Sequence, residues 1–291
     1  MFSDKNAILT VIARCLGALW IFDGLLQFQP QMFGQGFVVG ILVPNLSDQP
    51  TLLRQIVQAG IYFWNLDPVV SDILAACLQI GIGMLLLFPL GDKRFKIGAS
   101  VSIAWGIVVW LCGEGAGLLL TGNASLYTGA PGAVMLYVVL AIVLLLHERM
   151  RLQWFTTIAV LVFLLGAALQ LQPIFWTQGG VQAAAMASMM ESVTALQAFP
   201  ASIANLLGID PVASNAILAL LPLIVGVLLF IKPNRITGSI ALVFLGCMWW
   251  VGQDLGMLTS GIGTDPSTAP LVALFLLPLF LKRDAPTNAH A

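Results

Sequence analysis

Long apolar runs separated by short polar connections cover most of this chain of 291 residues. A helix needs about 20 apolar residues to cross a bilayer core, and most of the runs reach or approach that length. The pattern therefore predicts an all-α fold, a polytopic integral membrane helix bundle with eight transmembrane helices. The expected spans are Ile8 to Leu26, Val69 to Leu90, Ile97 to Thr121, Gly132 to Leu146, Trp154 to Leu171, Val212 to Ile231, Ile236 to Thr259 and Pro270 to Leu281.

One block of sequence, Trp110 to Pro131, recurs as Trp249 to Pro270. Both copies keep the same spacing between a Trp, three glycines and a Pro, which indicates an internal repeat. We therefore expect two four-helix repeats, residues 1–150 and 151–291, within one continuous membrane domain. The Asp67-Pro68 and Asp210-Pro211 pairs recur as well, and each has the pattern of a helix N-cap followed by Pro at the first helical position.

Most basic residues follow the second, fourth, sixth and eighth spans and so lie on one side of the membrane, together with Lys5. The positive-inside rule makes that side cytoplasmic. Because each half has an even number of spans, the repeat is expected to be parallel, with both termini in the cytoplasm. We expect a multi-pass protein of the bacterial cytoplasmic (inner) membrane. The basic residues are Lys93, Arg94, Lys96, Arg149, Arg151, Lys232, Arg235, Lys282 and Arg283.

The composition agrees with this class of protein. Hydrophobic residues make up 59% of the chain and charged residues 9%, whereas about a quarter of a soluble domain is charged. The expected partners are the lipid bilayer and a protein subunit or a second copy of the chain, with no nucleic acid. The four cysteines lie in apolar runs without a Cys-x-x-Cys pair, so no disulfide frame or zinc site is indicated.

Two long segments, Gln29 to Leu66 and Gln172 to Ile209, separate the first and second spans of each half. Their later parts have helical apolar spacing, which predicts external amphipathic helices over the bundle. Met186, Met189 and Met190 lie on one face of the second such helix. Their thioethers could bind Cu(I), or they could simply pack against neighbouring side chains.

Ionisable side chains inside a bilayer cost roughly 2.5–3.5 kcal/mol each, so they are candidates for ligand binding or proton handling. Three carboxylates, Asp23, Glu114 and Asp254, are expected in one outer layer. Either the charged groups reach the head groups, or at least one of them faces an internal cavity. The repeat places Glu114 opposite Gln253, so the halves are not chemically equivalent. The full candidate set is Arg14, Asp23, Gln27, Glu114, Gln253 and Asp254.

The recurring block also contains two Gly-x-x-x-Gly pairs, Gly113 with Gly117 and Gly252 with Gly256. This spacing allows two membrane helices to approach closely, so we expect these glycines in helix packing. A backbone-lined ligand channel is the alternative.

Other chemistries lack the residues that they need. The chain has two histidines, His147 and His290, and neither falls in an expected span, so no haem with two histidine ligands is expected in the bundle. No phosphate loop, nucleotide fingerprint or hydrolase triad is present. We therefore assign no catalytic residue and no built-in cofactor.

The first span, Arg14-Cys-Leu-Gly17 followed by Asp23-Gly24-Leu-Leu-Gln27, resembles the opening helix of DoxX-like membrane proteins. That family has four-helix bundles, and DoxD-type members are membrane subunits of thiosulfate:quinone oxidoreductase. The resemblance implies a tandem duplication of a DoxX-like unit. Gln27 stands where the family usually has Lys, and the second half has Thr157 and Val160 where the Arg and the first Gly would fall.

Three functions remain open at this point. The first, implied by the resemblance, is a membrane subunit of a bacterial redox system with a possible quinone ligand near Asp23, Glu114 and Asp254. The second is a carrier for protons, metal ions or small solutes, in which the carboxylates bind the cargo. The third is a structural subunit that organises a larger membrane complex.

Overall fold

This computed structural model describes residues 4–186 and 194–282, and those ranges contain helices and turns but no strand. Every expected span contains a helix. Four of them, α1, α3, α4 and α9, are long and apolar enough to cross a membrane, and the other four are shorter apolar helices. The eight are α1 (Asp4–Leu26), α3 (Pro68–Leu86), α4 (Lys93–Cys112), α5 (Ala133–Leu145), α6 (Gln153–Leu169), α9 (Pro211–Ile231), α10 (Arg235–Val251) and α11 (Thr268–Leu281).

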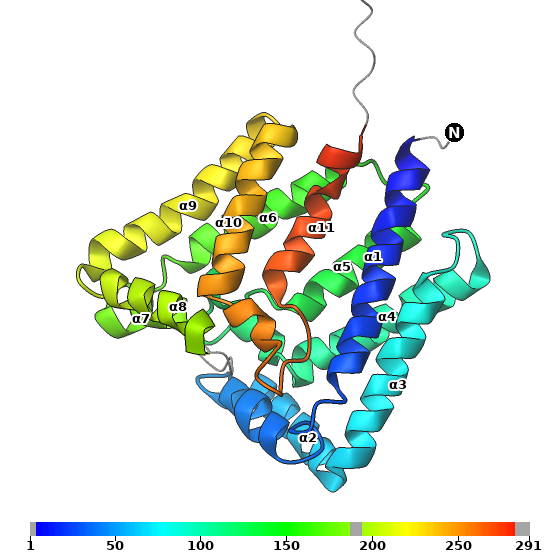
Figure 1. Cartoon of the computed structure of the whole chain (residues 1–291), viewed down its shortest axis with the longest axis horizontal. Helices are drawn as coiled ribbons and strands as arrows, with labels where there is room; N and C mark the ends of the chain where they lie inside the picture. Colours follow the sequence, from blue (N-terminus) through cyan, green and yellow to red (C-terminus); the bar gives the residue numbers. More distant parts are fainter. Residues whose placement is uncertain (1–3, 187–193, 283–291) are drawn as a thin grey trace, which may run out of the picture.

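The helices pack in matching pairs along the two halves of the chain. In the first half α1 packs on α3 and α4 on α5; in the second half α6 packs on α9 and α10 on α11. Helix α11 also contacts α1, α5 and α6, and Figure 1 shows it between α10 and α1. The two short helices α5 and α11 therefore join the halves at the centre of the bundle.

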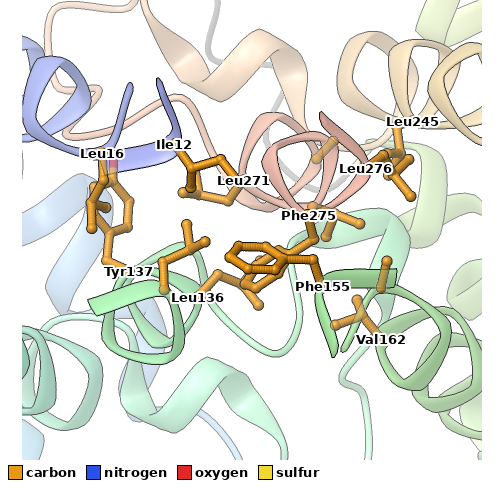
Figure 2. Close-up of a cluster of buried hydrophobic side chains, with 14 of the residues drawn as sticks. Ile12, Leu16, Leu136, Tyr137, Phe155, Val162, Leu245, Leu271, Phe275 and Leu276 are labelled. Carbon is orange, nitrogen blue, oxygen red and sulfur yellow. The ribbon is translucent and has the colours of Figure 1, made fainter. Parts of the chain in front are cut away.

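The apolar core forms around these central helices. Figure 2 shows Tyr137 of α5 beside Leu16 of α1, and Phe275 of α11 beside Phe155 of α6. The side chains of Tyr137, Phe155 and Phe275 are fully buried. Because neighbouring helices cover α5 and α11, burial within the protein explains their apolar composition without lipid contact.

Side-chain caps explain where two of the long helices begin. The Asp67 carboxylate accepts the Val70 N–H at 3.1 Å at the start of α3, and Asp210 accepts the Ala213 N–H at 3.0 Å at the start of α9. A Pro follows each cap at the first helical position. The predicted N-caps are confirmed.

The basic connections gather at one end of the molecule. Lys5 Nζ donates to the Glu148 carbonyl at 3.4 Å, and Arg235 Nη2 donates to the Lys282 carbonyl at 3.1 Å. The start of α1 and the end of α11 lie at this same end (Figure 1). The basic start of α1 therefore lies beside the end of α5, and the basic start of α10 lies beside the end of α11.

Shorter helices fill the two long connections. Helix α2 (Thr51–Leu66) buries Leu53 and Val57 of its apolar stripe, while α7 (Gln178–Met186) and α8 (Thr194–Leu207) occupy the second connection. Amphipathic helices were expected in both places. Met189 and Met190 lie outside the described residues, as does the side chain of Met186, so the methionine cluster is untested.

The third and seventh spans end earlier than expected, because α4 stops at Cys112 and α10 at Val251. A turn with four successive positive φ angles follows each helix. We call these turns, Gly115–Leu118 and Asp254–Met257, the first and second left-handed turns; their φ angles lie between 49° and 72°. L-residues avoid this conformation, at a cost of roughly 1–2 kcal/mol each, so glycine favours it locally.

The Gly-x-x-x-Gly prediction of helix packing is therefore wrong. Gly113 and Gly252 cap the ends of α4 and α10, and Gly117 and Gly256 lie inside the left-handed turns. A Cβ atom at Gly117 would collide with the Pro131 carbonyl, and one at Gly256 would lie 2.8 Å from the Asp265 carbonyl. The Gly-x-x-x-Gly spacing therefore comes from a tight turn at the end of each helix and not from contact between helices.

A tryptophan near the end of the preceding helix holds each left-handed turn against the segment that comes before the next helix. The Trp110 indole N–H donates to the Pro131 carbonyl at 2.8 Å, and the Trp249 indole N–H donates to the Pro266 carbonyl at 2.7 Å. Pro131 and Pro266 therefore have equivalent positions in the two halves, because each accepts the corresponding indole N–H. Pro270, the partner expected from sequence spacing, lies inside α11.

Candidate functional site

Glu114 stands between the end of α4 and the first left-handed turn. Its Oε1 accepts the Val134 N–H at 3.2 Å, which holds the carboxyl group over the start of α5. Its buried Oε2 has no hydrogen-bond partner. A Cβ atom at Gly132 would collide with this carboxyl group, so glycine at position 132 makes room for it.

Asp265 approaches Glu114 from the loop before α11. Its carboxylate accepts the Ser267 N–H at 2.7 Å and the Thr264 hydroxyl at 3.0 Å. Burial of the charged form raises the pKa of Asp265 above its usual range, although these two hydrogen bonds oppose the shift. Asp265 was absent from the sequence-based candidates, because it lies in a polar loop outside every apolar run.

Asp23 completes a group of three carboxyls that we call the acid cluster: Asp23, Glu114 and Asp265. Asp23 lies on α1, is 2% exposed, and interacts electrostatically with both other acids and with the buried Tyr137 hydroxyl. Its Oδ1 has no hydrogen-bond partner. Within the described ranges, no Lys or Arg is among the groups that interact with the three acids.

A cavity of about 200 Å³, the outer cavity, lies on one side of Glu114 and Asp265. Its lining is mainly polar or glycine and comes from both halves of the chain. Thr128 and Gly129 contribute from the loop between α4 and α5, and Gln253 and Ser267 from the second half.

A larger cavity of about 660 Å³, the helix cavity, lies on the other side of the same two acids. Helices α2, α3 and α4 supply most of its wall, which is largely apolar. Its polar groups include Gln27 from α1, Gln79 from α3, and the indoles of Trp64 and Trp105. Both indole N–H groups are buried without an acceptor, and Gln27 Oε1 is buried without a donor.

The second left-handed turn also lines the outer cavity, through Gly256 and Met257, but it does not line the helix cavity. Gln253 occupies the position of Glu114, and its amide is paired at both ends. Its Oε1 accepts the Ala269 N–H at 2.9 Å and its Nε2 donates to the Leu126 carbonyl at 3.0 Å. The Leu126 side chain fills the space above Gly166, which has the place on α6 that Asp23 has on α1.

The structure brings together some of the residues predicted from the sequence and separates others. Glu114 lines both cavities, Gln27 lines the helix cavity and Gln253 lines the outer cavity, while Asp23 interacts electrostatically with Glu114 but lines neither cavity. Arg14 is exposed on α1 and takes no part. Asp254 is buried in the second left-handed turn and lines neither cavity. The common outer layer of Asp23, Glu114 and Asp254 stays a prediction.

Sequence reasoning also overlooked three polar residues within apolar helices. Gln79 and Tyr137 face the site described above, and Asp72 is buried in α3 with neither carboxyl oxygen paired. Asp72 and Gln79 lie two helical turns apart in one apolar run, and that spacing could have identified them. In the described ranges, no three His, Cys, Asp or Glu side chains are grouped as a metal site would require.

The chain matches no family model, no curated protein and no solved structure with which it was compared.

Proposed function

We propose that the chain is a multi-pass protein of the bacterial cytoplasmic membrane, with eight spans in two parallel four-helix units of the DoxX-like type, residues 1–150 and 151–291. Three features support this arrangement. The N-caps at Asp67 and Asp210 correspond, the two left-handed turns correspond, and an indole holds each turn in place. The basic ends of the helices on one side support cytoplasmic termini.

We further propose that the helix cavity binds a lipid-soluble quinone and that the chain is the membrane subunit of a quinone-linked redox system. The observation that carries this proposal is the pair of unpaired indole N–H groups, Trp64 Nε1 and Trp105 Nε1, in the wall of an apolar cavity. A buried donor without an acceptor is costly, so a ligand that supplies acceptors would be favoured. A quinone head offers two carbonyl oxygens on a flat ring.

The rest of the cavity fits the same ligand class. Its apolar wall suits a ring and an isoprenoid tail, and cavities of about 300–1,000 Å³ are usual for small-molecule sites. Gln27 Oε1 and Glu114 Oε2 are buried acceptors without donors. They would accept hydrogen bonds from the two hydroxyl groups of the reduced quinol. An electron-donating protein partner is part of this proposal.

Cys112 provides a direct test, because its side chain lines the helix cavity, whereas Cys247 is exposed on α10. We expect decylubiquinone to protect Cys112 from maleimide labelling in lipid nanodiscs and to leave the labelling of Cys247 unchanged. It should also bind about 5- to 10-fold more weakly to Trp105→Phe, since one hydrogen bond is worth about 1 kcal/mol. Trp250→Phe is the matched control, because that indole donates to the Leu196 carbonyl outside the cavity. Equal labelling of Cys112 with and without the quinone would contradict the proposal.

A second candidate function is a proton-coupled carrier, and one observation favours it: the acid cluster lies where an outer polar cavity meets a cavity among apolar helices. In liposomes, transport by such a carrier should fall at least tenfold in Glu114→Gln. Asp254→Asn should leave transport unchanged because Asp254 lines neither cavity. Unchanged transport in Glu114→Gln would exclude this function.

A further inference from the structure

The outer cavity and the helix cavity share one wall. Five residues line both cavities, and two of them, Glu114 and Asp265, carry carboxyl groups. The remaining three, Ile41, Gly113 and Thr264, offer no group that titrates near neutral pH. Glu114 and Asp265 are therefore the titratable groups of the wall that the two cavities share.

Behind this wall the acid cluster continues toward the interior. Asp23 on α1 interacts with Asp265 and Glu114, and with the phenol of Tyr137 on α5. Gln27 lies one helical turn further along α1, is 3% exposed, lines the helix cavity, and has a buried Oε1 without a hydrogen-bond partner. Interacting polar groups thus extend from the shared wall to Asp23 and Tyr137, and Gln27 of the same helix as Asp23 lines the helix cavity.

Three carboxyl groups in one buried cluster cannot all be ionised, because no described cation balances their charge and like charges repel strongly at low dielectric. Protons are therefore shared within the cluster, and its acids titrate together. The unpaired oxygens Asp23 Oδ1 and Glu114 Oε2 leave acceptor positions to which a shared proton can move.

We propose that the acid cluster is a proton-exchange route between water in the outer cavity and the head group of a ligand in the helix cavity. This inference rests on the proposed quinone site. It adds that protons taken up or released by the bound head group enter and leave through the outer cavity. Glu114 and Asp265 exchange protons with the outer cavity, and Asp23 and Tyr137 extend the route inward.

The route can be measured without any quinone, by infrared spectroscopy of the protein in lipid nanodiscs after rapid mixing with D2O. We expect the C=O stretching band of the protonated cluster, assigned by its loss in Asp23→Asn, to shift at the rate of solvent exchange. Thr128→Trp places a bulky ring in the outer cavity and should slow that shift at least tenfold. Thr128→Val, which keeps the cavity open, is the matched control and should exchange like the unmodified protein.

A second variant keeps the test decisive if Thr128→Trp does not fold. Asp265→Asn removes a carboxyl from the shared wall and should also slow exchange at Asp23 at least tenfold. The proposal is overturned if the band shifts equally fast in both variants, or if it does not shift in the unmodified protein. Failure of quinone to protect Cys112 would instead remove the proposed function, and the exchange result would stand separately.

Discussion

The two left-handed turns have the same backbone conformation and hold different chemistry. After α4 the turn carries Glu114, whose Oε2 is unpaired, and it faces Asp23 and Asp265. After α10 the turn follows Gln253, whose amide makes hydrogen bonds at both ends. Glu114, directly before the first turn, lines both cavities, whereas Gln253 and the second turn line the outer cavity alone of the two, and Leu126 packs over Gly166 in the second half.

This difference separates what the fold needs from what a function needs. In the second half, the hydrogen-bonded amide of Gln253 and the buried side chain of Leu126 are sufficient to stabilise the fold around the turn. The acid cluster does not stabilise the fold in this way, because burying a polar group without a hydrogen-bond partner costs free energy. Strained and unsatisfied groups of this kind concentrate at functional sites, so the first turn is where we place the function.

The largest expected effect concerns the backbone that both turns share. Gly117→Ala places a Cβ atom against the Pro131 carbonyl at a φ of +63°. We expect the free energy of unfolding to fall by about 4 kcal/mol, from overpacking together with the left-handed conformation. Thermal unfolding in detergent checks this. Gly246→Ala is the control, since a Cβ atom there meets nothing within 4 Å and helix propensity predicts a small gain.

The next largest effect is expected at Leu126, which lies between α4 and α5 and packs against α6 of the second half. Leu126 is 1% exposed and packs over Gly166. Leu126→Ala should lower the free energy of unfolding by about 3 kcal/mol, because it creates a cavity that the rigid frame cannot close. Leu120→Ala, at an exposed position of the same connection, should change it by less than about 0.5 kcal/mol. Equal losses in the two variants would show that the second half is not filled as described.

Exchanging the residues before the turns tests the comparison directly. Gln253→Glu removes the donor to the Leu126 carbonyl and places a carboxyl group where only 4% of the side chain is exposed. We expect a loss of about 2 kcal/mol in the free energy of unfolding. The reverse change, Glu114→Gln, keeps the acceptor for the Val134 N–H and should cost no stability. A loss in Glu114→Gln as large as in Gln253→Glu would mean that the first turn depends on its acid for folding.

The helices were predictable because burial and lipid contact both favour apolar side chains with helical continuity. Asp67 and Asp210 also marked helix starts correctly, since an Asp before Pro has few other local structures. The helix ends at Cys112 and Val251 were missed. Glycine spacing suits both a close helix contact and a left-handed turn, and only tertiary contacts such as Trp110 with Pro131 decide between them.

The site was predictable only in part, for a physical reason. Asp23, Gln27 and Glu114 were identified because polar groups in apolar runs are costly. Asp265 was missed because an Asp in a polar loop has no visible free-energy cost in the sequence. The cost arises only when the fold buries its carboxyl group beside other acids. Its sequence surroundings, Thr-Asp-Pro, indicate only a turn.

The smallest expected effect is a pH dependence at Asp265, which lies in the loop before α11 and interacts with Glu114, the residue before the first turn. Asp265 faces Asp23, Glu114 and Tyr137, with hydrogen bonds from Ser267 and Thr264, and its pKa is raised in the folded protein.

The folded state therefore binds this proton more tightly than the unfolded state does. The contribution of Asp265 to stability is fully present below its unfolded pKa, about pH 4, and it is lost as the pH rises toward the pKa of the folded state. Melting temperatures measured across this range should therefore fall less steeply with pH in Asp265→Asn than in the unmodified protein. Asp48→Asn, at an exposed loop position, should keep the original slope. If Asp265→Asn keeps it as well, Asp265 is not buried among acids, and the contrast between the two turns would then rest on Glu114 and Asp23 alone.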